Sequence, residues 1–309
     1  MTKAVLWTAQ DAATATGGKT TGDWTVTGIS IDSRKVSKGD LFIALKGPNF
    51  DGQKFAQAAL DAGAHAVMVS DANGIDDTDK VLLVDDTMVA LERLGIAGRE
   101  RSKAKIVAIT GSVGKTGTKE ALKYVLSQQG KTHASPASFN NHWGVPITLA
   151  TLPVDAEFGV FEIGMNHPGE ISTLVKMVKP SVALITTVVG AHTEFFKDEA
   201  EIAMAKAEIF EGLDSDGTVI LNRDNLHYFA LARRAKELGL SNIKCFGTDA
   251  VSNYRLFEAN IVTDGSAVRA RVGGQDLEYF IGCPGEHWVL NSLAVLGCVD
   301  AIGADFVKA

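Results

Sequence analysis

Two glycines, a lysine and a threonine stand together near the middle of the 309-residue chain, in the order Gly111-x-x-Gly114-Lys115-Thr116. An apolar run precedes them and a helical pattern, Lys119–Leu126, follows. This layout is typical of a phosphate-binding loop, in which glycines let the backbone N–H groups turn towards an anion. The lysine can reach the phosphates, and the threonine hydroxyl can bind Mg²⁺. The segment therefore predicts a nucleotide site. Its spacing is two residues shorter than the common GxxxxGK(S/T) pattern.

Chemically active side chains also follow or interrupt the later apolar segments. Glu162 lies within the apolar run 157–163, and His192 follows the apolar run 181–189. Ligands of open α/β sheets bind beyond the carboxyl ends of the strands, so we expect both side chains beside the loop. A buried carboxylate at position 162 needs a partner, which is either a shared Mg²⁺ ion or a nearby basic side chain. His192 is compatible with a metal ligand or with a hydrogen-bonded core histidine.

Lys206 lies in a helical segment, 202–210, that is otherwise mostly apolar. Long lysine side chains usually keep their charged end in water, so the pattern alone predicts a solvated lysine.

Regular alternation of strands and helices must position these residues. Up to about residue 85, apolar segments separated by turns and helical patterns predict a small α/β domain, 1–86. From residue 105 onwards, strands and helices alternate as in a doubly wound, mostly parallel sheet. The stretch 254–281 then shows strand-like alternation on both sides of Gly273-Gly274, which predicts an appended antiparallel β segment. We therefore expect an α/β protein with a second domain at 87–309.

Composition narrows the function classes. A formal net charge of −7 argues against non-specific binding of nucleic acid. No apolar run is long enough for a bilayer and no signal-peptide pattern is evident, so we expect a cytoplasmic protein without membrane attachment. The three cysteines show no C-x-x-C spacing, which favours small core residues over a zinc site or disulfides.

Several separated motifs together resemble the Mur ligase family. They are the loop 110–116, Glu162-Ile-Gly, Ala191-His192, Lys206–Phe210 and the stretch Gly285–Asn291. The stretch 32–52 is similar to the UDP-binding domain of this family. The segments 138–148 and 164–171 favour those members that add D-alanyl-D-alanine.

The resemblance implies roles for individual residues. ATP would be bound by Thr110, Gly111, Ser112, Val113, Gly114, Lys115, Thr116 and Asn291. Mg²⁺ would be held by Thr116, Glu162 and His192, and Lys206 matches the family lysine that can be carbamylated, which replaces the solvated interpretation. The UDP end of the substrate would meet Ser33 and Arg34, and the muramoyl-peptide channel would be bordered by Asn140 and Asn141. Trp288 stands where the family usually has asparagine, so an adenine contact there would be by stacking.

The implied reaction is ATP-dependent amide ligation in peptidoglycan precursor synthesis, part of cell-wall biogenesis. The terminal carboxylate of UDP-N-acetylmuramoyl-tripeptide would attack ATP to give an acyl phosphate, and the amine of D-alanyl-D-alanine would then displace phosphate. The family has a third, C-terminal domain that binds the incoming dipeptide, and no counterpart is found in these 309 residues. We therefore expect that these 309 residues cannot complete ligation alone. We also expect a monomer.

Three other functions remain compatible with the sequence. The first is another Mur-type ligase that adds a diamino acid or glutamate. The second is a P-loop switch or kinase, although an NKxD motif is missing and no apolar run ending in aspartate supplies a usual Walker-B acid. The third is a nucleotide-binding module without catalysis.

Overall fold

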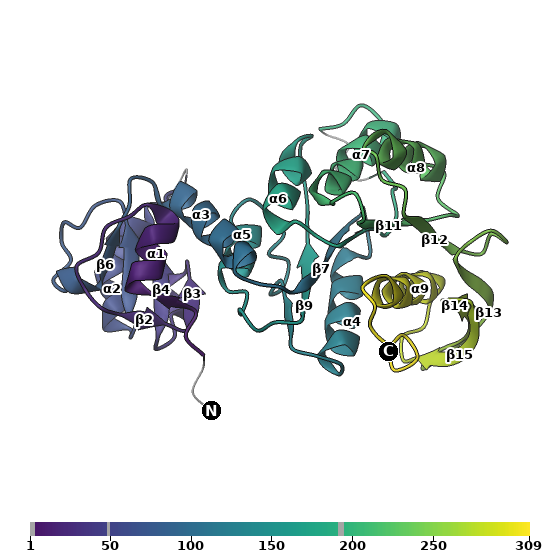
Figure 1. Ribbon diagram of the computed structural model, residues 1–309, viewed down its shortest axis with the longest axis horizontal. Coiled ribbons are helices and arrows are strands. Elements are labelled where there is room, and N and C mark those ends of the chain that lie inside the picture. The colour runs from purple at the N-terminus through teal and green to yellow at the C-terminus, as the bar shows by residue number, and fades with distance from the viewer. Residues whose placement is uncertain (1–3, 48–49, 191–194) are drawn as a thin grey trace. The chain divides into compact units, whose positions relative to one another are not determined.

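The computed structural model describes residues 4–47, 50–190 and 195–309 (Figure 1). The chain forms two compact units. The first unit comprises Met1–Ser102 together with Pro146–Val154, and the second comprises Lys103–Val145 together with Asp155–Ala309.

The first unit contains a four-stranded parallel sheet in the order β3-β4-β5-β6. Its two central strands are buried throughout, which explains why they are apolar apart from Asp40 at the start of β4. The strand-like segment 25–31 is interrupted at Thr27, so its first part pairs with β1 in a separate antiparallel ribbon. The elements of this unit are β1 (Trp7–Thr8), α1 (Ala9–Thr16), β2 (Thr25–Val26), β3 (Gly28–Ser30), η1 (Ser33–Lys35), β4 (Asp40–Ile43), η2 (Gly52–Phe55), α2 (Ala56–Asp61), β5 (Ala66–Val69), η3 (Thr78–Lys80), β6 (Val81–Leu83) and α3 (Thr87–Glu100).

Helix α3 packs within the first unit. The carboxylate of Asp86 caps its first turn by accepting from the Met88 and Val89 amides. Arg93 of α3 donates to the Thr16 carbonyl at the end of α1, at 3.1 Å. The compact units therefore divide after α3, at Ser102, whereas the functional domain boundary at residue 87 stays a prediction.

The second unit is organised on a nine-stranded sheet in the order β15-β14-β13-β12-β11-β10-β7-β9-β8. Pairing is parallel from β8 to β13 and antiparallel from β13 to β15, which confirms the expected parallel sheet with an appended antiparallel segment. The turn between β14 and β15 uses Gly273 and Gly274 at φ of 56° and 80°, as the glycine pair predicted. The strands are β7 (Lys105–Thr110), β8 (Thr132–Ala134), β9 (Phe158–Glu162), β10 (Val182–Ile185), β11 (Thr218–Asn222), β12 (Ile243–Gly247), β13 (Tyr254–Val262), β14 (Gly265–Val272) and β15 (Gln275–Ile281).

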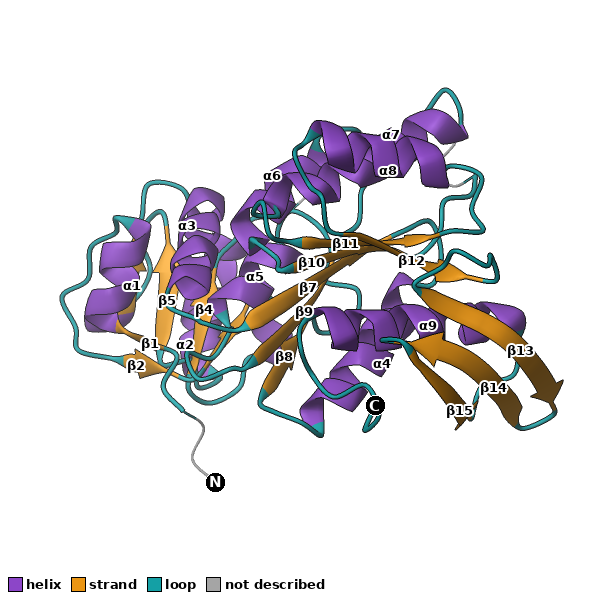
Figure 2. Ribbon diagram, turned by 45° about the vertical axis from the view of Figure 1, so that its right-hand side comes forward, coloured by secondary structure: helices purple, strands orange, loops and turns teal. Residues whose placement is uncertain are grey.

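Helices cover both faces of this sheet (Figure 2). Helices α4 (Lys115–Ser127) and α9 (Glu286–Ala301) pack on one face, where the core cluster includes Leu122 and Leu293, both fully buried. The other face carries α6 (Glu170–Val178), α7 (Glu199–Ala207), η4 (Glu208–Gly212) and α8 (Tyr228–Glu237). Helix α5 (Gly144–Ala150) has residues in both units.

The strand order reverses at β7. The chain leaves β7 towards β8 and β9 on one side and returns to β10 on the other side. In doubly wound sheets this switch point opens a crevice beyond the carboxyl ends of the strands, where ligands bind. The predicted phosphate-binding loop follows β7 and therefore lies at this point.

We predict that the burial of α4 against the sheet stabilises the loop-bearing unit. Leu122→Ala is expected to lower the free energy of unfolding by about 2–5 kcal/mol, because it leaves a cavity at a fully buried position. Tyr124→Ala on the same helix is the control, since that side chain is 70% exposed. Urea unfolding of both variants measures the difference, and equal losses would contradict the packing described here.

Candidate functional site

The loop between β7 and α4 adopts a backbone that only glycine accepts. Gly111 and Gly114 have φ of 152° and 87°. A Cβ atom at Gly111 would lie 2.0 Å from the Thr186 hydroxyl oxygen, and one at Gly114 would lie 2.9 Å from the Asn291 amide nitrogen. The two glycines are thus required both by conformation and by close neighbours.

The residues that follow strand β10 hold this loop in place. The Thr186 hydroxyl donates to the Val113 carbonyl at 2.7 Å, and the Ser112 amide donates to the Thr187 carbonyl at 2.9 Å. The Ser112 hydroxyl donates to the carbonyl of Val189 at 2.8 Å. The loop therefore has a defined shape held by its neighbouring strand.

Lys115 begins α4 and folds back over the loop. Its ammonium group donates to the Gly111 carbonyl at 2.7 Å. Burial lowers the pKa of this ammonium, and the negative charge of Glu162 opposes that shift. Behind it, the buried Thr110 hydroxyl has no hydrogen-bond partner within the described part of the chain.

Glu162 ends strand β9 and is 1% exposed. Its carboxylate accepts from the Thr116 hydroxyl at 3.0 Å and from the Asn140 side-chain amide at 2.8 Å. Both donors are neutral, and within the described residues no ion pair to Glu162 is found. The sequence left two partners open for this carboxylate, a shared Mg²⁺ ion or a basic side chain. Among the described residues, the carboxylate forms no ion pair with a basic side chain. The structure joins three predicted site residues here.

A cavity of about 150 Å³ opens beside this cluster. It is lined by the predicted residues Gly111, Lys115, Asn140, Asn141 and Lys206, together with Gly164, Met165, Asn166 and Glu170. Asn141 also accepts from the Gly144 amide at 2.9 Å and so caps the start of α5.

Lys206 is buried, with 2% of the residue exposed, so the solvated lysine predicted from the pattern alone is wrong. The pKa of its ammonium is lowered to about 8, mainly because the group is buried and also because the positive charge of Lys115 is nearby. Glu208 lies two residues after Lys206. Its carboxylate accepts from the Gly169 amide at 2.7 Å and from the Ser172 amide at 3.1 Å. These bonds satisfy the first turn of α6 and fix the end of the helix that carries Lys206, a role that sequence reasoning missed.

Helix α9 supplies the far side of the loop. Asn291 lies against Gly114, as the close approach to that glycine shows. The Trp288 indole lies over the first turn of α4, because a Cβ atom at Gly117 would be only 2.6 Å from its ring. Both side chains are partly exposed and adjoin the loop, where the resemblance placed an adenine contact.

The remaining predicted residues lie elsewhere. His192 falls outside the described residues. Ser33 and Arg34 lie in the first unit, in η1 after strand β3, where Arg34 binds the Asp32 carboxylate through two bonds of 2.9 Å. The hydrogen bond from Arg34 lowers the pKa of Asp32 to about 2.

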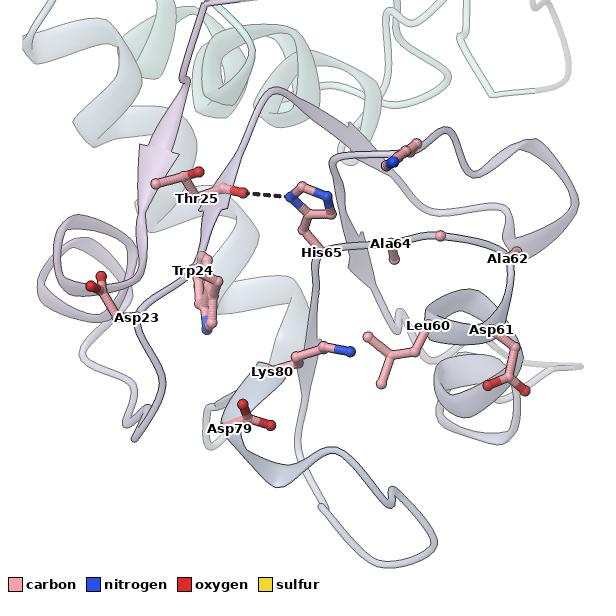
Figure 3. Close-up of a pocket in the computed structure, with 12 residues that line it drawn as sticks. Asp23, Trp24, Thr25, Leu60, Asp61, Ala62, Ala64, His65, Asp79 and Lys80 are labelled. Carbon is pink, nitrogen blue, oxygen red and sulfur yellow. Dashed lines mark hydrogen bonds between the residues drawn. The ribbon is translucent and has the colours of Figure 1, made fainter.

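A larger groove of about 700 Å³ lies in the first unit (Figure 3). It is lined by residues that precede β4, β5 and β6, such as Lys38, His65 and Lys80, and His65 contacts the Thr25 carbonyl at 3.1 Å. The groove is therefore at the amino ends of the parallel strands, the opposite edge from Ser33 and Arg34. None of the predicted site residues lines it.

Neither a clustered metal site nor a membrane-spanning helix is found in the described residues. No group of three or more histidine, cysteine, aspartate or glutamate side chains is arranged to hold a metal ion among them. In the same residues, none of the helices has the length and apolar character needed to cross a membrane.

We predict that Lys206 titrates near pH 8 in the folded protein, because its ammonium is desolvated. In lysine-labelled protein, an NMR titration is expected to show one side chain with its midpoint near 8. Its resonance is assigned by its loss in Lys206→Arg. Lys115→Met should raise that midpoint, since it removes a neighbouring positive charge. A midpoint above 10 would contradict the buried environment.

Comparison with known families supports the two parts of the chain separately. Residues 109–299 match the Mur ligase middle domain. Residues 25–98 match the Mur ligase family catalytic domain.

Individual relatives cover nearly all of this chain. It is 38% identical over 301 residues to the UDP-N-acetylmuramoyl-tripeptide–D-alanyl-D-alanine ligase of Rickettsia prowazekii, covering 97% of this chain and 67% of the relative. The enzyme of the same name from Escherichia coli is 35% identical, covering 93% and 63%. A crystal structure of MurF from Acinetobacter baumannii superposes with a TM-score of 0.86 at 31% identity, covering 98% of this chain and 66% of that one. MurF ligase from Thermotoga maritima, in complex with ADP, gives 0.75 at 25% identity, covering 91% and 65%.

The chain thus spans about two thirds of the length of these relatives. The middle-domain match alone covers more than half of its residues, at 109–299. The chain belongs to the Mur ligase family.

Proposed function

We propose that this chain is the nucleotide-binding part of a ligase that adds D-alanyl-D-alanine to UDP-N-acetylmuramoyl-tripeptide, with ATP consumed, in peptidoglycan precursor synthesis. The observation that carries the proposal is the convergence of Lys115, Thr116, Glu162 and Lys206 at the switch point of the sheet. The names of the relatives, which extend over nearly the whole chain, support the choice of substrates.

The residues present fit a nucleotide phosphate with a magnesium ion. The loop needs glycine at positions 111 and 114, where a Cβ atom would collide with Thr186 or Asn291, and it lies at the N-terminus of α4, where the helix dipole favours an anion. Thr116 and Glu162 offer adjacent hydroxyl and carboxylate oxygens, the ligands that Mg²⁺ prefers. These two residues would hold the ion, and His192 is proposed as a further ligand. When bound, the ion would neutralise phosphate charge and act as a Lewis acid.

In the proposed reaction, the terminal carboxylate of the tripeptide attacks the γ-phosphorus of ATP, and ADP leaves. The acyl phosphate is then attacked by the amine of D-alanyl-D-alanine, the amide bond forms, and phosphate leaves. Lys115 contributes by placing its ammonium charge against the phosphates, which reduces the repulsion between the two anionic reactants. The loop amides hold the transferred group in line.

The neighbouring residues would orient the substrate. Asn140 and Asn141 line the cavity beside Glu162 and would border the peptide channel. Ser33 and Arg34 would contact the UDP end. The lowered pKa of Lys206 leaves part of its amine neutral near pH 8, which is the form that reacts with CO₂ to give a carbamate. In the same proposal, the protein is a cytoplasmic monomer.

We predict that Lys115→Ala weakens binding of Mg²⁺–ADP by about 10- to 100-fold, because a charged hydrogen bond to phosphate is worth roughly 1.5–3 kcal/mol. The matched control is Lys123→Ala, which removes an exposed lysine from the same helix. Isothermal titration calorimetry of the 309-residue chain measures both variants. Equal affinities in wild type and Lys115→Ala would sink the assignment of the loop.

A ligation assay with the full protein that contains this chain tests which substrates it accepts. Omitting UDP-N-acetylmuramoyl-tripeptide or D-alanyl-D-alanine in turn should abolish formation of the muramoyl pentapeptide. Mass spectrometry of the product and a phosphate-release assay follow the reaction. A preference for glutamate or a diamino acid as the amine would assign the chain to a different ligase of the family. Phosphate release that needs no muramoyl substrate would favour a plain nucleotidase.

A further inference from the structure

Lys119 is a fully buried lysine on the helix that follows the loop. Its ammonium group donates to the Ser135 carbonyl at 3.0 Å and to the Ala137 carbonyl, and it pairs with the Glu120 carboxylate at 2.8 Å. An ammonium group has three donors, and all three meet an acceptor here. Burial of such a group is unfavourable unless it is paired in this way, so the lysine makes a specific connection between α4 and residues 135–137.

The connected segment has a strained backbone. Ala137 has a φ of 45°, a left-handed conformation that is unfavourable for a residue with a Cβ atom. Strain of this kind persists only where surrounding interactions impose it. The bond from Lys119 to the Ala137 carbonyl is the interaction that holds this turn against the helix.

The segment 135–140 contacts the end of strand β9 and the residues just after it, through Ser135 at one end and Asn140 at the other. The Ser135 hydroxyl oxygen accepts from the Glu162 amide at 3.3 Å. At the other end, the Asn140 side chain donates to the Glu162 carboxylate at 2.8 Å, and the Asn140 carbonyl accepts from the Gly164 amide at 2.8 Å.

These contacts form a continuous network of hydrogen bonds that begins and ends on helix α4. It runs from Lys119 to residues 135–137, on to Asn140 and Glu162, and back through the Thr116 hydroxyl to the first turn of the helix. We propose that Lys119 is a positioning residue: its ammonium group holds residues 135–140 so that Asn140 orients the Glu162 carboxylate towards Thr116. Only the part of this inference that concerns a divalent cation bound at Thr116 and Glu162 rests on the proposed function.

Hydrogen–deuterium exchange of the ligand-free chain tests the positioning itself. Lys119→Met, which keeps the length of the side chain but removes its charge and donors, should accelerate amide exchange in residues 135–141 by about tenfold or more. Glu120→Gln is the matched control, because it removes the exposed partner and leaves both carbonyl contacts. Unchanged exchange in Lys119→Met would overturn the proposal, whether or not a nucleotide binds.

Metal affinity tests the consequence for the site, with Mn²⁺ and ADP as probes. Lys119→Met and Asn140→Ala should each raise the half-saturating Mn²⁺ concentration about tenfold, and the double variant should be no worse than either alone. Binding of ADP without metal should not change in Lys119→Met. Additive effects would show that Lys119 does not act through Asn140. If wild type binds no Mn²⁺–ADP, the proposed function fails, and the exchange experiment still decides the positioning role.

A measurement on the unaltered chain covers the case in which Lys119→Met does not fold. In wild type, the amides of Ser135 and Asn140, which donate to the Val160 and Ser138 carbonyls, should exchange as slowly as those of β9. Fast exchange there would show that the segment is not held, and would overturn the proposal. Lys119→Gln, which keeps one donor without the charge, should give intermediate exchange in residues 135–141.

Discussion

The burial of the Glu162 carboxylate among neutral donors is the constraint on which the site depends. Two hydrogen bonds from Thr116 and Asn140 satisfy its oxygens but supply no positive charge. An anion in such a position attracts cations from its surroundings, and Lys115 feels this attraction in the opposing effect on its pKa. The same carboxylate ties together strand β9, the first turn of α4 and the segment before α5. A single buried carboxylate thus links the sheet to the loop.

The site residues could be predicted where residues close by in the sequence mark them. The loop was recognisable because glycine spacing and the following lysine act within six residues. Glu162 was recognisable because a charge interrupts an apolar strand. The helical pattern around Lys206 did not reveal it, and only the family resemblance did, since the helix is apolar on several sides and its packing decides which side is buried. No local pattern marked Lys119, because the two carbonyl groups that it binds lie 16 and 18 residues further along the chain.

The fold followed the same rule. Alternation of strands and helices predicted the parallel sheet, and the glycine pair at 273–274 predicted the antiparallel hairpin. Strand β8 has three residues and carries too little periodicity to be recognised. The membership of residues 146–154 in the first unit is a long-range property. It depends on close packing between Gly98 and the backbone of Leu149, where a Cβ atom would lie 2.3 Å from the carbonyl oxygen. No local pattern encodes that approach.

The interleaving of the two units along the chain has a consequence for biosynthesis. The first unit contains Trp7, whose indole donates to the Ala150 carbonyl at 2.8 Å in a buried bond. That acceptor is translated only after β7, α4 and β8 of the second unit. An emerging chain therefore cannot finish its first unit before it has made the beginning of the second, so strictly sequential folding, domain by domain from the ribosome, is closed to it. Until residue 150 has been synthesised, the N-terminal core lacks the contact made by Trp7 and stays partly uncovered.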